Sequence, residues 1–283
     1  MSKIRIVTDS TADLPVEIIK EYKITVVPLR VNFGNQSFLE GRELTPNEFY
    51  KKLGNSENLP TTSQPSPGDF TDIFEELANE NVEEIISIHL SRKLSGTYQS
   101  ALLAKSLVTN KVKVEVIDSG LVSMGLGLVV LAAARAVQEG KKLQEILNII
   151  HDVKGKIDTF FVVDTLDYLQ KGGRIGKASQ IVGSLLNIKP ILTITNGEVH
   201  SFEKIRGKGK ALDRLIEIAY SRVPANNKLL CAITHSNNLD TALNLHKKIL
   251  NKLNCSEIII SDIGSVVGTH VGPGTVAFMY YVI

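Results

Sequence analysis

Leu94-Ser95-Gly96-Thr97-Tyr98-Gln99-Ser100-Ala101 has the pattern of a turn that leads from a buried strand into a helix. An apolar run, residues 85–90, precedes it, and apolar residues continue at helical spacing to Leu107. Ser95 is a favourable N-cap, and the small residues after it let another group approach the free N–H groups of the first helical turn. The stretch predicts an anion pocket in outline. A serine here is more often an ordinary cap, so ligand binding requires other polar groups to converge on it.

Two other stretches can supply such groups. Residues 61–66, Thr-Thr-Ser-Gln-Pro-Ser, are rich in hydroxyls, and residues 268–274, Gly-Thr-His-Val-Gly-Pro-Gly, combine glycines with a histidine. Both read as loops next to regular elements. Hydroxyls, a histidine and helix starts suit the holding of a carboxylate or phosphate better than bond cleavage.

Strand-like and helix-like segments alternate along the first half of the chain. Strands are predicted at 4–8, 85–90 and 112–118, and helices at 15–22, 67–79, 95–107, 124–138 and 143–153. Such βα repeats favour a parallel sheet, whose ligands bind at the carboxyl ends of the strands. Asp9, Ser10, Ser95 and Ser119 follow strand ends and are candidates for one common rim.

The segments between these elements, and those of the second half, are less regular. Residues 25–33 are rich in β-forming residues and can pair with 36–39 as a hairpin. A short helix is predicted at 45–52, and a loop is predicted at 54–68. A second unit begins with a strand at 158–164, a short helix at 166–170 and a glycine-rich basic turn at 171–176. Further helices and strands then alternate over 178–186, 190–195, 199–204, 210–221, 229–234, 239–253 and 257–261, and 275–282 is a strand or a buried helix. We expect two domains, an N-terminal parallel-sheet α/β/α domain (1–156) and a C-terminal α/β domain with a mixed sheet (157–283).

Composition excludes several classes of protein. The 283 residues carry a net charge of +2, which gives no strong positive electrostatic field to attract nucleic acid. The apolar fraction of 43% suits an ordinary folded core. The N-terminus enters a strand-like segment directly, without the apolar stretch of a signal peptide, and no apolar run is long enough to cross a bilayer, so we expect a cytoplasmic protein. Cys231 and Cys255 are distant in sequence, in apolar surroundings, and are expected to be buried free thiols.

Standard nucleotide, hydrolase and metal motifs do not fit the sequence. Residues 172–179 resemble a P-loop only superficially, because the first glycine is missing and Lys177 is followed by Ala178. Residues 125–130 lack the last glycine of a dinucleotide fingerprint, no Gly-x-Ser-x-Gly occurs, and the six histidines show no zinc-binding spacing. We therefore expect neither a cofactor nor a metal.

These same stretches resemble the DegV family of bacterial fatty-acid-binding proteins. Seven segments appear in the family's order: 7–15, 27–29, 62–66, 94–101, 118–119, 169–175 and 268–274. The resemblance implies two α/β domains with a long-chain fatty acid between them, such as palmitate or a similar acid, its carboxylate at hydroxyls and a helix N-terminus and its tail in an apolar tunnel. By motif, Thr62 and Ser95 would bind the carboxylate and His270 would complete the hydrogen-bond network. The further site residues expected are Ser63, Gly96, Ser119 and Gly272.

Some members of the family are carrier subunits of a fatty acid kinase, in which a separate subunit uses ATP to phosphorylate the bound carboxylate for phospholipid synthesis. Arg174 resembles the exposed basic residue that docks that kinase. The expected partners are thus a fatty acid and a kinase subunit, with no nucleic acid and at most transient membrane contact. The resemblance implies that the chain is a lipid-binding carrier and not an enzyme.

Several alternatives remain open at this stage. The protein could be a lipid sensor or store without a kinase partner, or a hydrolase with Ser95 as nucleophile, His270 as base and Asp118 as the orienting acid. Taken alone, His270 is a structural or exposed histidine in a flexible glycine-rich frame. Residues 124–131 either line the tunnel or form a plain core helix.

Overall fold

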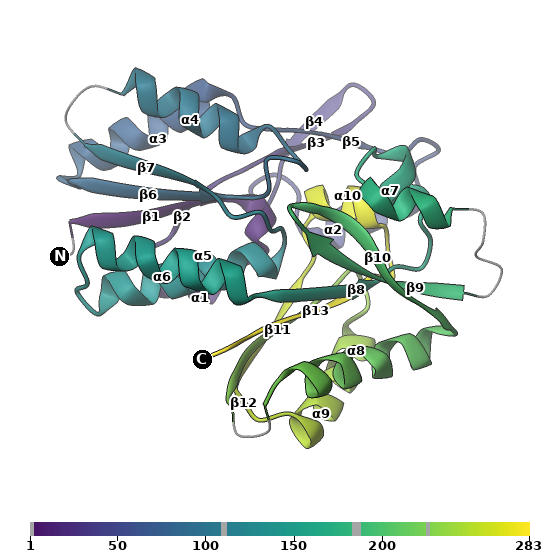
Figure 1. Cartoon of the computed structure of the whole chain (residues 1–283). Coiled ribbons are helices and arrows are strands. Elements are labelled where there is room, and N and C mark those ends of the chain that lie inside the picture. Colours follow the sequence, from purple (N-terminus) through teal and green to yellow (C-terminus); the bar gives the residue numbers. More distant parts are fainter. Residues whose placement is uncertain (1–2, 109–111, 183–187, 225–226) are drawn as a thin grey trace.

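Two large β-sheets built from separate stretches of the chain form the framework of the molecule (Figure 1). The computed structural model describes residues 3–108, 112–182, 188–224 and 227–283. The first sheet is parallel throughout and has the order β2 (Thr25–Val27), β1 (Ile4–Asp9), β6 (Glu84–His89) and β7 (Lys113–Asp118).

Helices cover both faces of the parallel sheet (Figure 1). On one face lie α3 (Pro67–Asn79) and α4 (Thr97–Leu107), and on the other α5 (Met124–Gln138), α6 (Leu143–Lys156) and the short α1 (Val16–Glu21). Because side chains alternate along a strand, Ile6 of β1 joins the cluster around α5, whereas Val7 joins the cluster around α3 and α4. The expected α/β/α arrangement is confirmed.

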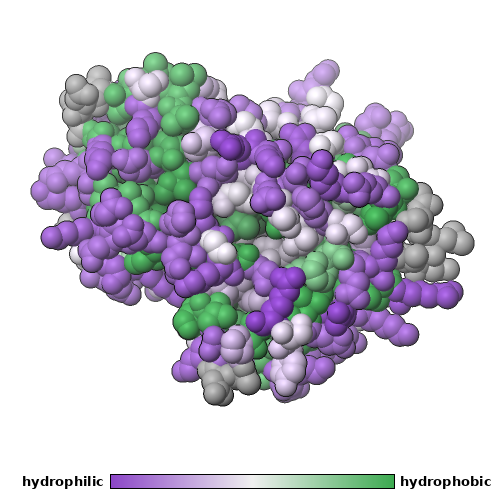
Figure 2. Space-filling model, in the orientation of Figure 1, coloured by the Kyte–Doolittle hydropathy of each residue, from purple (hydrophilic) through white to green (hydrophobic). Residues whose placement is uncertain are grey.

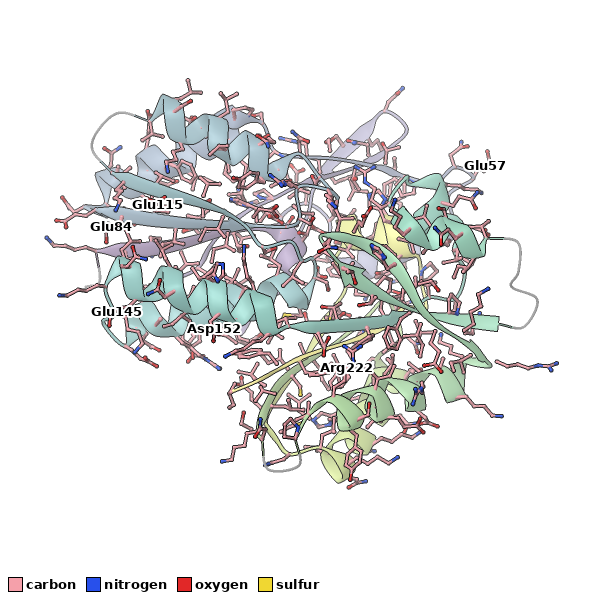
Figure 3. All side chains as sticks on the ribbon, in the orientation of Figure 1. Glu57, Glu84, Glu115, Glu145, Asp152 and Arg222 are labelled. Atoms are coloured by element: carbon pink, nitrogen blue, oxygen red, sulfur yellow. The ribbon has the colours of Figure 1, made fainter. Side chains whose placement is uncertain are left out.

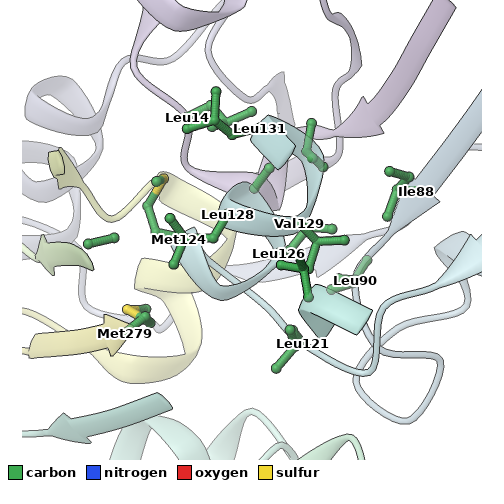
Figure 4. Packing of buried hydrophobic residues seen from close by; sticks show 14 of the residues in the cluster. Leu14, Ile88, Leu90, Leu121, Met124, Leu126, Leu128, Val129, Leu131 and Met279 are labelled. Carbon is green, nitrogen blue, oxygen red and sulfur yellow. The ribbon is translucent and has the colours of Figure 1, made fainter. Parts of the chain in front are cut away.

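Helix α5 is the central core element. Its residues 124–134 are apolar on all sides, and residues 124–131 are all buried, as expected for a helix packed between layers. A Cβ on Gly127 would lie 2.6 Å from the carbonyl oxygen of Ala12, so only glycine permits this close approach. Figure 4 shows part of the cluster, and in this view Met124 lies between Leu14 and Met279 of the second sheet.

The second sheet is mixed and has six strands in the order β10-β9-β8-β13-β11-β12. Its strands are β8 (Asp158–Val162), β9 (Ile188–Thr195), β10 (Glu198–Arg206), β11 (Leu229–His235), β12 (Cys255–Asp262) and β13 (Val276–Val282). Among the described strands of this sheet, only β11 and β12 are parallel neighbours. Helices α8 (Lys208–Arg222) and α9 (Leu239–Lys252) cover one face, and the other turns toward the α5 cluster. The mixed sheet is as predicted, and the domain boundary near residue 156 stays a prediction.

A small third sheet and several short helices join the two large sheets. The antiparallel strands are β3 (Arg30–Phe33), β4 (Gln36–Leu39) and β5 (Thr61–Ser63), and the helical pieces are η1 (Ser10–Ala12), α2 (Pro46–Gly54), α7 (Asp167–Lys171), η2 (Gly176–Ile181) and α10 (Ser265–Val271). The hairpin of β3 and β4 confirms the expected pairing.

Three sequence predictions are wrong in this region. Residues 54–68 are not all loop, because Thr61–Ser63 pairs with β3 despite the flanking prolines. Residues 268–271 are helical, because α10 is held by tertiary contacts that its glycine content does not reveal. The helix expected at 178–186 is a 3₁₀ turn as far as Ile181, and residues 183–187 lie outside the described residues.

The two cysteines are both free, as predicted, but Cys255 is only half-buried, and the two residues are neighbours in space. Cys231 is buried on β11 and Cys255 begins β12, and their sulfur atoms lie 3.5 Å apart because these strands are adjacent.

The visible surface is largely hydrophilic, with apolar residues gathered over α4 and β7 (Figure 2). Within the described residues, no helix is both long enough and apolar enough to cross a membrane.

A buried carboxylate fixes the ends of β1 and β6. Asp9, fully buried, accepts hydrogen bonds from Thr11 N (3.1 Å) and Leu90 N (3.0 Å), and its Oδ2 lies 2.9 Å from His89 Nδ1. His89 Nε2 in turn lies 2.7 Å from Ser87 Oγ. The network sets the geometry of the loops after both strands. The sequence leaves Asp9 open between a place on the rim and a helix cap, and the structure places it in the interior, where it caps the short 3₁₀ turn at Ser10–Ala12.

We expect Asp9→Asn to destabilise the protein by about 3 kcal/mol, because it removes a charged acceptor from a buried network. Thermal unfolding, followed by circular dichroism, should show a midpoint lowered by roughly 6–12 °C. Asp152→Asn is the matched control, since Asp152 forms only an exposed pair with Lys156 on α6 (Figure 3). Equal midpoints for the two variants would contradict the role given to Asp9.

Candidate functional site

A cavity of about 340 Å³ lies between the two large sheets. One wall comes from the loops at the carboxyl ends of the parallel strands, with Leu90, Leu94 and Val122, and another from the face of the mixed sheet, with Phe161 and Met279. Strand β5 and helix α10 close one end. The volume is within the range of about 300–1,000 Å³ that is typical of small-ligand sites. The wall is mainly apolar, and its polar groups can therefore fix the orientation of a ligand.

Thr62, Ser95 and His270 lie together in the wall of this cavity. Thr62 Oγ1 is 2.9 Å from His270 Nε2, and Ser95 Oγ is 2.9 Å from Thr97 Oγ1. Three segments that are far apart in sequence thus bring hydroxyls and an imidazole to one cavity. We call Thr62, Ser95 and His270 the hydroxyl–imidazole cluster.

Local backbone structure positions the two hydroxyls. Thr62 is the central residue of β5 and pairs with Val31 of β3. Ser95 follows a tight turn in which its N–H and that of Leu94 both donate to Ser91 O. The prediction that Ser95 caps the helix is wrong, because α4 begins at Thr97 with Gly96 as its N-cap, and Ser95 Oγ only accepts a 3.4 Å contact from Thr97 N. The Ser95 side chain faces the cavity.

His270 is positioned by α10 and not by a flexible loop. Two buried carboxyl groups from the N-terminal half hold the start of this helix: Glu40 Oε1 accepts from Val266 N (2.6 Å) and Ser265 Oγ (3.0 Å), and Asp13 Oδ1 accepts from Gly264 N (3.0 Å). The helix carries His270 at its far end, next to Thr62. No local sequence pattern marks this arrangement, because its key residues are isolated acids in unrelated segments.

Burial shifts the protonation equilibria of this region. Desolvation, assisted by the positive charge of Arg174, lowers the pKa of His270 to about 4, so its imidazole is neutral at neutral pH. Burial raises the pKa of Asp13 well above its usual value, with a further contribution from Glu40, and burial likewise raises the pKa of Glu40. A neutral imidazole can either donate to or accept from Thr62, depending on its tautomer.

Five of the predicted site residues line the cavity and three do not. Those in the wall are Thr62, Ser63, Ser95, His270 and Arg174. Gly96 lies behind Ser95 as the cap of α4, Ser119 is buried and hydrogen-bonds the backbone of Leu121, and Gly272 ends α10 with a φ of +73°.

Arg174 is half-buried, although it was expected to be exposed. Its Nε donates to Leu94 O (3.1 Å) and one terminal nitrogen donates to Gly172 O (2.8 Å), so the side chain is held against the turn that carries Ser95. The guanidinium group therefore belongs to both the glycine-rich turn and the cavity wall.

Other wall residues were not predicted from the sequence. Gln64 lines the cavity and donates from Nε2 to Ser100 Oγ, and the wall also includes Ser123, just before α5, and Thr159 of β8. Gln64 directly follows the predicted site residues Thr62 and Ser63, so its position in the sequence could have identified it. No local signal marks Ser123 or Thr159. The tunnel role considered for residues 124–131 is not supported, because none of them is among the lining residues of the described structure.

The triad required by the hydrolase alternative does not form in the described part of the chain. Ser95 Oγ contacts Thr97 and His270 Nε2 contacts Thr62. Asp118 Oδ1 accepts from the N–H groups of Gly120 and Arg92, and so it does not orient His270. Among the described residues, no three or more His, Cys, Asp or Glu side chains are grouped so that they could hold a metal ion.

Comparison with known proteins gives matches along the whole chain. A family model described as "Uncharacterised protein, DegV family" matches residues 3–282. A DegV domain-containing protein of Halalkalibacterium halodurans is 43% identical over 284 residues, which cover 100% of this chain and 99% of the relative.

Solved structures show the same fold. A DegV family protein from Thermus thermophilus, described by its fatty acid binding, is 35% identical and superposes with a TM-score of 0.93, covering 99% of both chains. A stearic-acid-binding protein from Eubacterium ventriosum is 25% identical, with a TM-score of 0.92 over 99% of this chain and 98% of that one.

We expect the His270 imidazole to titrate near pH 4 in NMR spectra of histidine-labelled protein. Because the pKa in the folded state lies below the ordinary value of about 6.5, the unfolded chain binds this proton more readily, and protonation destabilises the fold as the pH falls from about 6.5 to about 4. Arg174→Gln removes one positive charge and should raise this pKa, while burial keeps it below the ordinary value. A His270 midpoint near pH 6.5 in the unmodified protein would show that the imidazole is not buried as described.

Proposed function

The chain belongs to the DegV family, and from this premise we propose that it binds a long-chain fatty acid in the cavity between the two sheets. The observation that carries the proposal is the hydroxyl–imidazole cluster in the wall of an apolar cavity. Fatty acid binding by the structural relatives from Thermus thermophilus and Eubacterium ventriosum supports the same ligand class.

The carboxylate is held by Thr62 and Ser95, with Ser63 beside them. Each hydroxyl donates one hydrogen bond to an anionic oxygen, and His270 Nε2–H donates to Thr62 Oγ1, which leaves the threonine proton free for the ligand. This direction of donation requires the Nε2–H tautomer of a neutral imidazole. The first turn of α4, behind Gly96, adds a favourable dipole of about 0.3–2 kcal/mol.

The acyl chain provides most of the affinity. A buried methylene contributes roughly 0.8 kcal/mol, so about fifteen of them contribute on the order of 12 kcal/mol before the costs of association. Leu90, Leu94, Phe161, Ile194 and Met279 supply apolar wall for such a chain. The polar cluster then determines which end of the acid lies at α10.

Thr62→Val and Ser95→Ala should each weaken fatty acid binding by roughly 10- to 100-fold, because each removes a hydrogen bond to a charged group. Native mass spectrometry of the purified protein, and displacement of a fluorescent fatty acid, measure the bound fraction and the affinity. Ser106→Ala is the control, since Ser106 is exposed near the end of α4 and donates only to Leu103 O. If no fatty acid co-purifies and none is taken up, the proposed function is wrong.

The bound acid is presented to a separate ATP-dependent kinase subunit that forms the acyl phosphate. Support comes from the family resemblance, from the lack of a P-loop in the sequence, and from Arg174, whose guanidinium group lies in the cavity wall beside Ser95. In this role the protein is a carrier, and its own residues position the carboxylate without phosphorylating it.

Arg174→Ala should retain fatty acid uptake while acyl-phosphate formation with a fatty acid kinase subunit and ATP falls by at least about tenfold, as expected for a docking hot spot. Lys171→Ala, an exposed charge in the same turn, is the matched control and should stay close to the unmodified protein. If Arg174→Ala supports acyl-phosphate formation as well as the unmodified protein does, Arg174 does not dock the kinase. Lack of any kinase-dependent product would favour a lipid store or sensor.

A further inference from the structure

Helices α7 and α10 pack side by side, and two glycines permit their close contact (Figure 1). A Cβ on Gly272 would lie 2.3 Å from Tyr168 Cδ2, and a Cβ on Gly172 would lie 2.3 Å from His270 Nδ1. Gly272 has a φ of +73°, so its backbone alone favours glycine. Gly172 has φ −76° and ψ −6°, a conformation that residues with side chains also adopt. The lack of a side chain at Gly172 is therefore required by packing and not by the backbone.

The turn that carries Gly172 forms a fixed wall for the His270 ring. Its backbone closes onto α7 through three hydrogen bonds, in which Gly172 N donates to Tyr168 O (2.9 Å), Gly173 N to Gln170 O (3.1 Å) and Arg174 N to Leu169 O (2.9 Å). These bonds hold the Gly172 backbone against the Nδ1 edge of the imidazole, while Thr62 Oγ1 lies 2.9 Å from Nε2. A side chain at position 172 would require the ring to leave this place.

The two nitrogens of the His270 ring have different surroundings. Nε2 faces the Thr62 hydroxyl, which can accept a hydrogen bond as well as donate one. Nδ1 is buried against Gly172 and has no hydrogen-bonding partner among the described residues. A proton on Nδ1 would be a buried donor without an acceptor, whereas a proton on Nε2 reaches the Thr62 oxygen. The packing at Gly172 therefore favours the Nε2–H tautomer of the neutral ring.

We propose that Gly172 is a positioning residue of the fatty acid site, and that its bare backbone holds the His270 ring against Thr62 as the Nε2–H tautomer. Nε2–H then donates to Thr62 Oγ1, and the threonine proton points to the ligand carboxylate. Gly172 is not among the lining residues of the described structure, so it acts only through His270. This inference rests on the proposed function and adds to it the residue that sets the direction of the hydrogen bonds.

The first measurement is the tautomer of His270 in ¹⁵N-histidine-labelled protein. A protonated and a bare ring nitrogen have well-separated ¹⁵N resonances, so the NMR spectrum identifies the nitrogen that carries the proton. We expect a single tautomer, protonated at Nε2, in the unmodified protein at neutral pH.

The second measurement is the affinity for stearic acid, by displacement of a fluorescent fatty acid. Gly172→Ala should displace the His270 ring, lose the single tautomer and bind stearic acid roughly three- to tenfold more weakly, as expected for the loss of one hydrogen bond between neutral groups. Gly155→Ala is the matched control, because Gly155 is an exposed residue of α6 whose added methyl has no described neighbour within 4 Å beyond its own helix. This control should change neither the tautomer nor the affinity.

Paired thermal midpoints separate packing on the ring from a general structural role. In the unmodified background, Gly172→Ala should lower the midpoint by roughly 2–10 °C, as expected for overpacking in a protein of this size. In the His270→Ala background the ring is gone, and the same substitution should lower the midpoint much less. The part that remains comes from Tyr168 O, which would lie 2.9 Å from the added methyl in both backgrounds.

The outcomes separate the inference from the proposed function. An Nδ1–H tautomer in the unmodified protein, equal midpoint losses in the two backgrounds, or unchanged affinity in Gly172→Ala would each overturn the inference. Binding of stearic acid by the unmodified protein in any of these cases leaves the proposed function intact. If the unmodified protein binds no fatty acid, the proposed function fails and the positioning role fails with it. If Gly172→Ala does not fold, we expect the double variant with His270→Ala to fold, and its failure to do so would also overturn the inference.

Discussion

The burial of two carboxyl groups at the start of α10 is the constraint on which the site depends. Asp13 and Glu40 come from the N-terminal half of the chain, yet their oxygens accept hydrogen bonds from Gly264 N and from Val266 N and Ser265 Oγ in the C-terminal half. Their raised pKa values reflect the desolvation that this arrangement imposes. The contacts fix one end of α10, and the other end carries His270 to Thr62. The contacts between the N-terminal and C-terminal halves and the position of His270 in the site therefore depend on the same helix, α10.

This arrangement separates two tasks that the proposed binding of an amphipathic ligand requires. The cavity wall is apolar over most of its area, so it stabilises an alkyl chain without strong directional preference. The hydroxyl–imidazole cluster is neutral at neutral pH, because burial and Arg174 keep His270 unprotonated. Neutral donors can hold a carboxylate without a buried ion pair, which suits the proposed transfer of the bound acid to a partner.

The sequence predicted the fold well where the signal is local. The helix predicted at 67–79 is α3 with its observed limits, because Ser66 and Asp69 form a local capping box at its start, and the helix predicted at 124–138 is α5. It failed where tertiary contacts decide the conformation: β5 exists because it pairs with β3, and α10 because Asp13 and Glu40 hold its start. In the site, motif resemblance singled out Thr62, Ser95 and His270, which the fold brings to one cavity. The packing of Gly172 on His270 could not be found, since a glycine in a turn looks the same whether its own backbone or a neighbouring side chain requires it.

The most direct test of this account is a crystal structure of the protein with a bound long-chain fatty acid. The account predicts density for the acid in the cavity between the sheets, with carboxylate oxygens within hydrogen-bonding distance of Thr62 Oγ1 and Ser95 Oγ and the chain running over the apolar wall at Phe161 and Met279. A carboxylate at the opposite end of the cavity, or an acid bound elsewhere on the molecule, would contradict it.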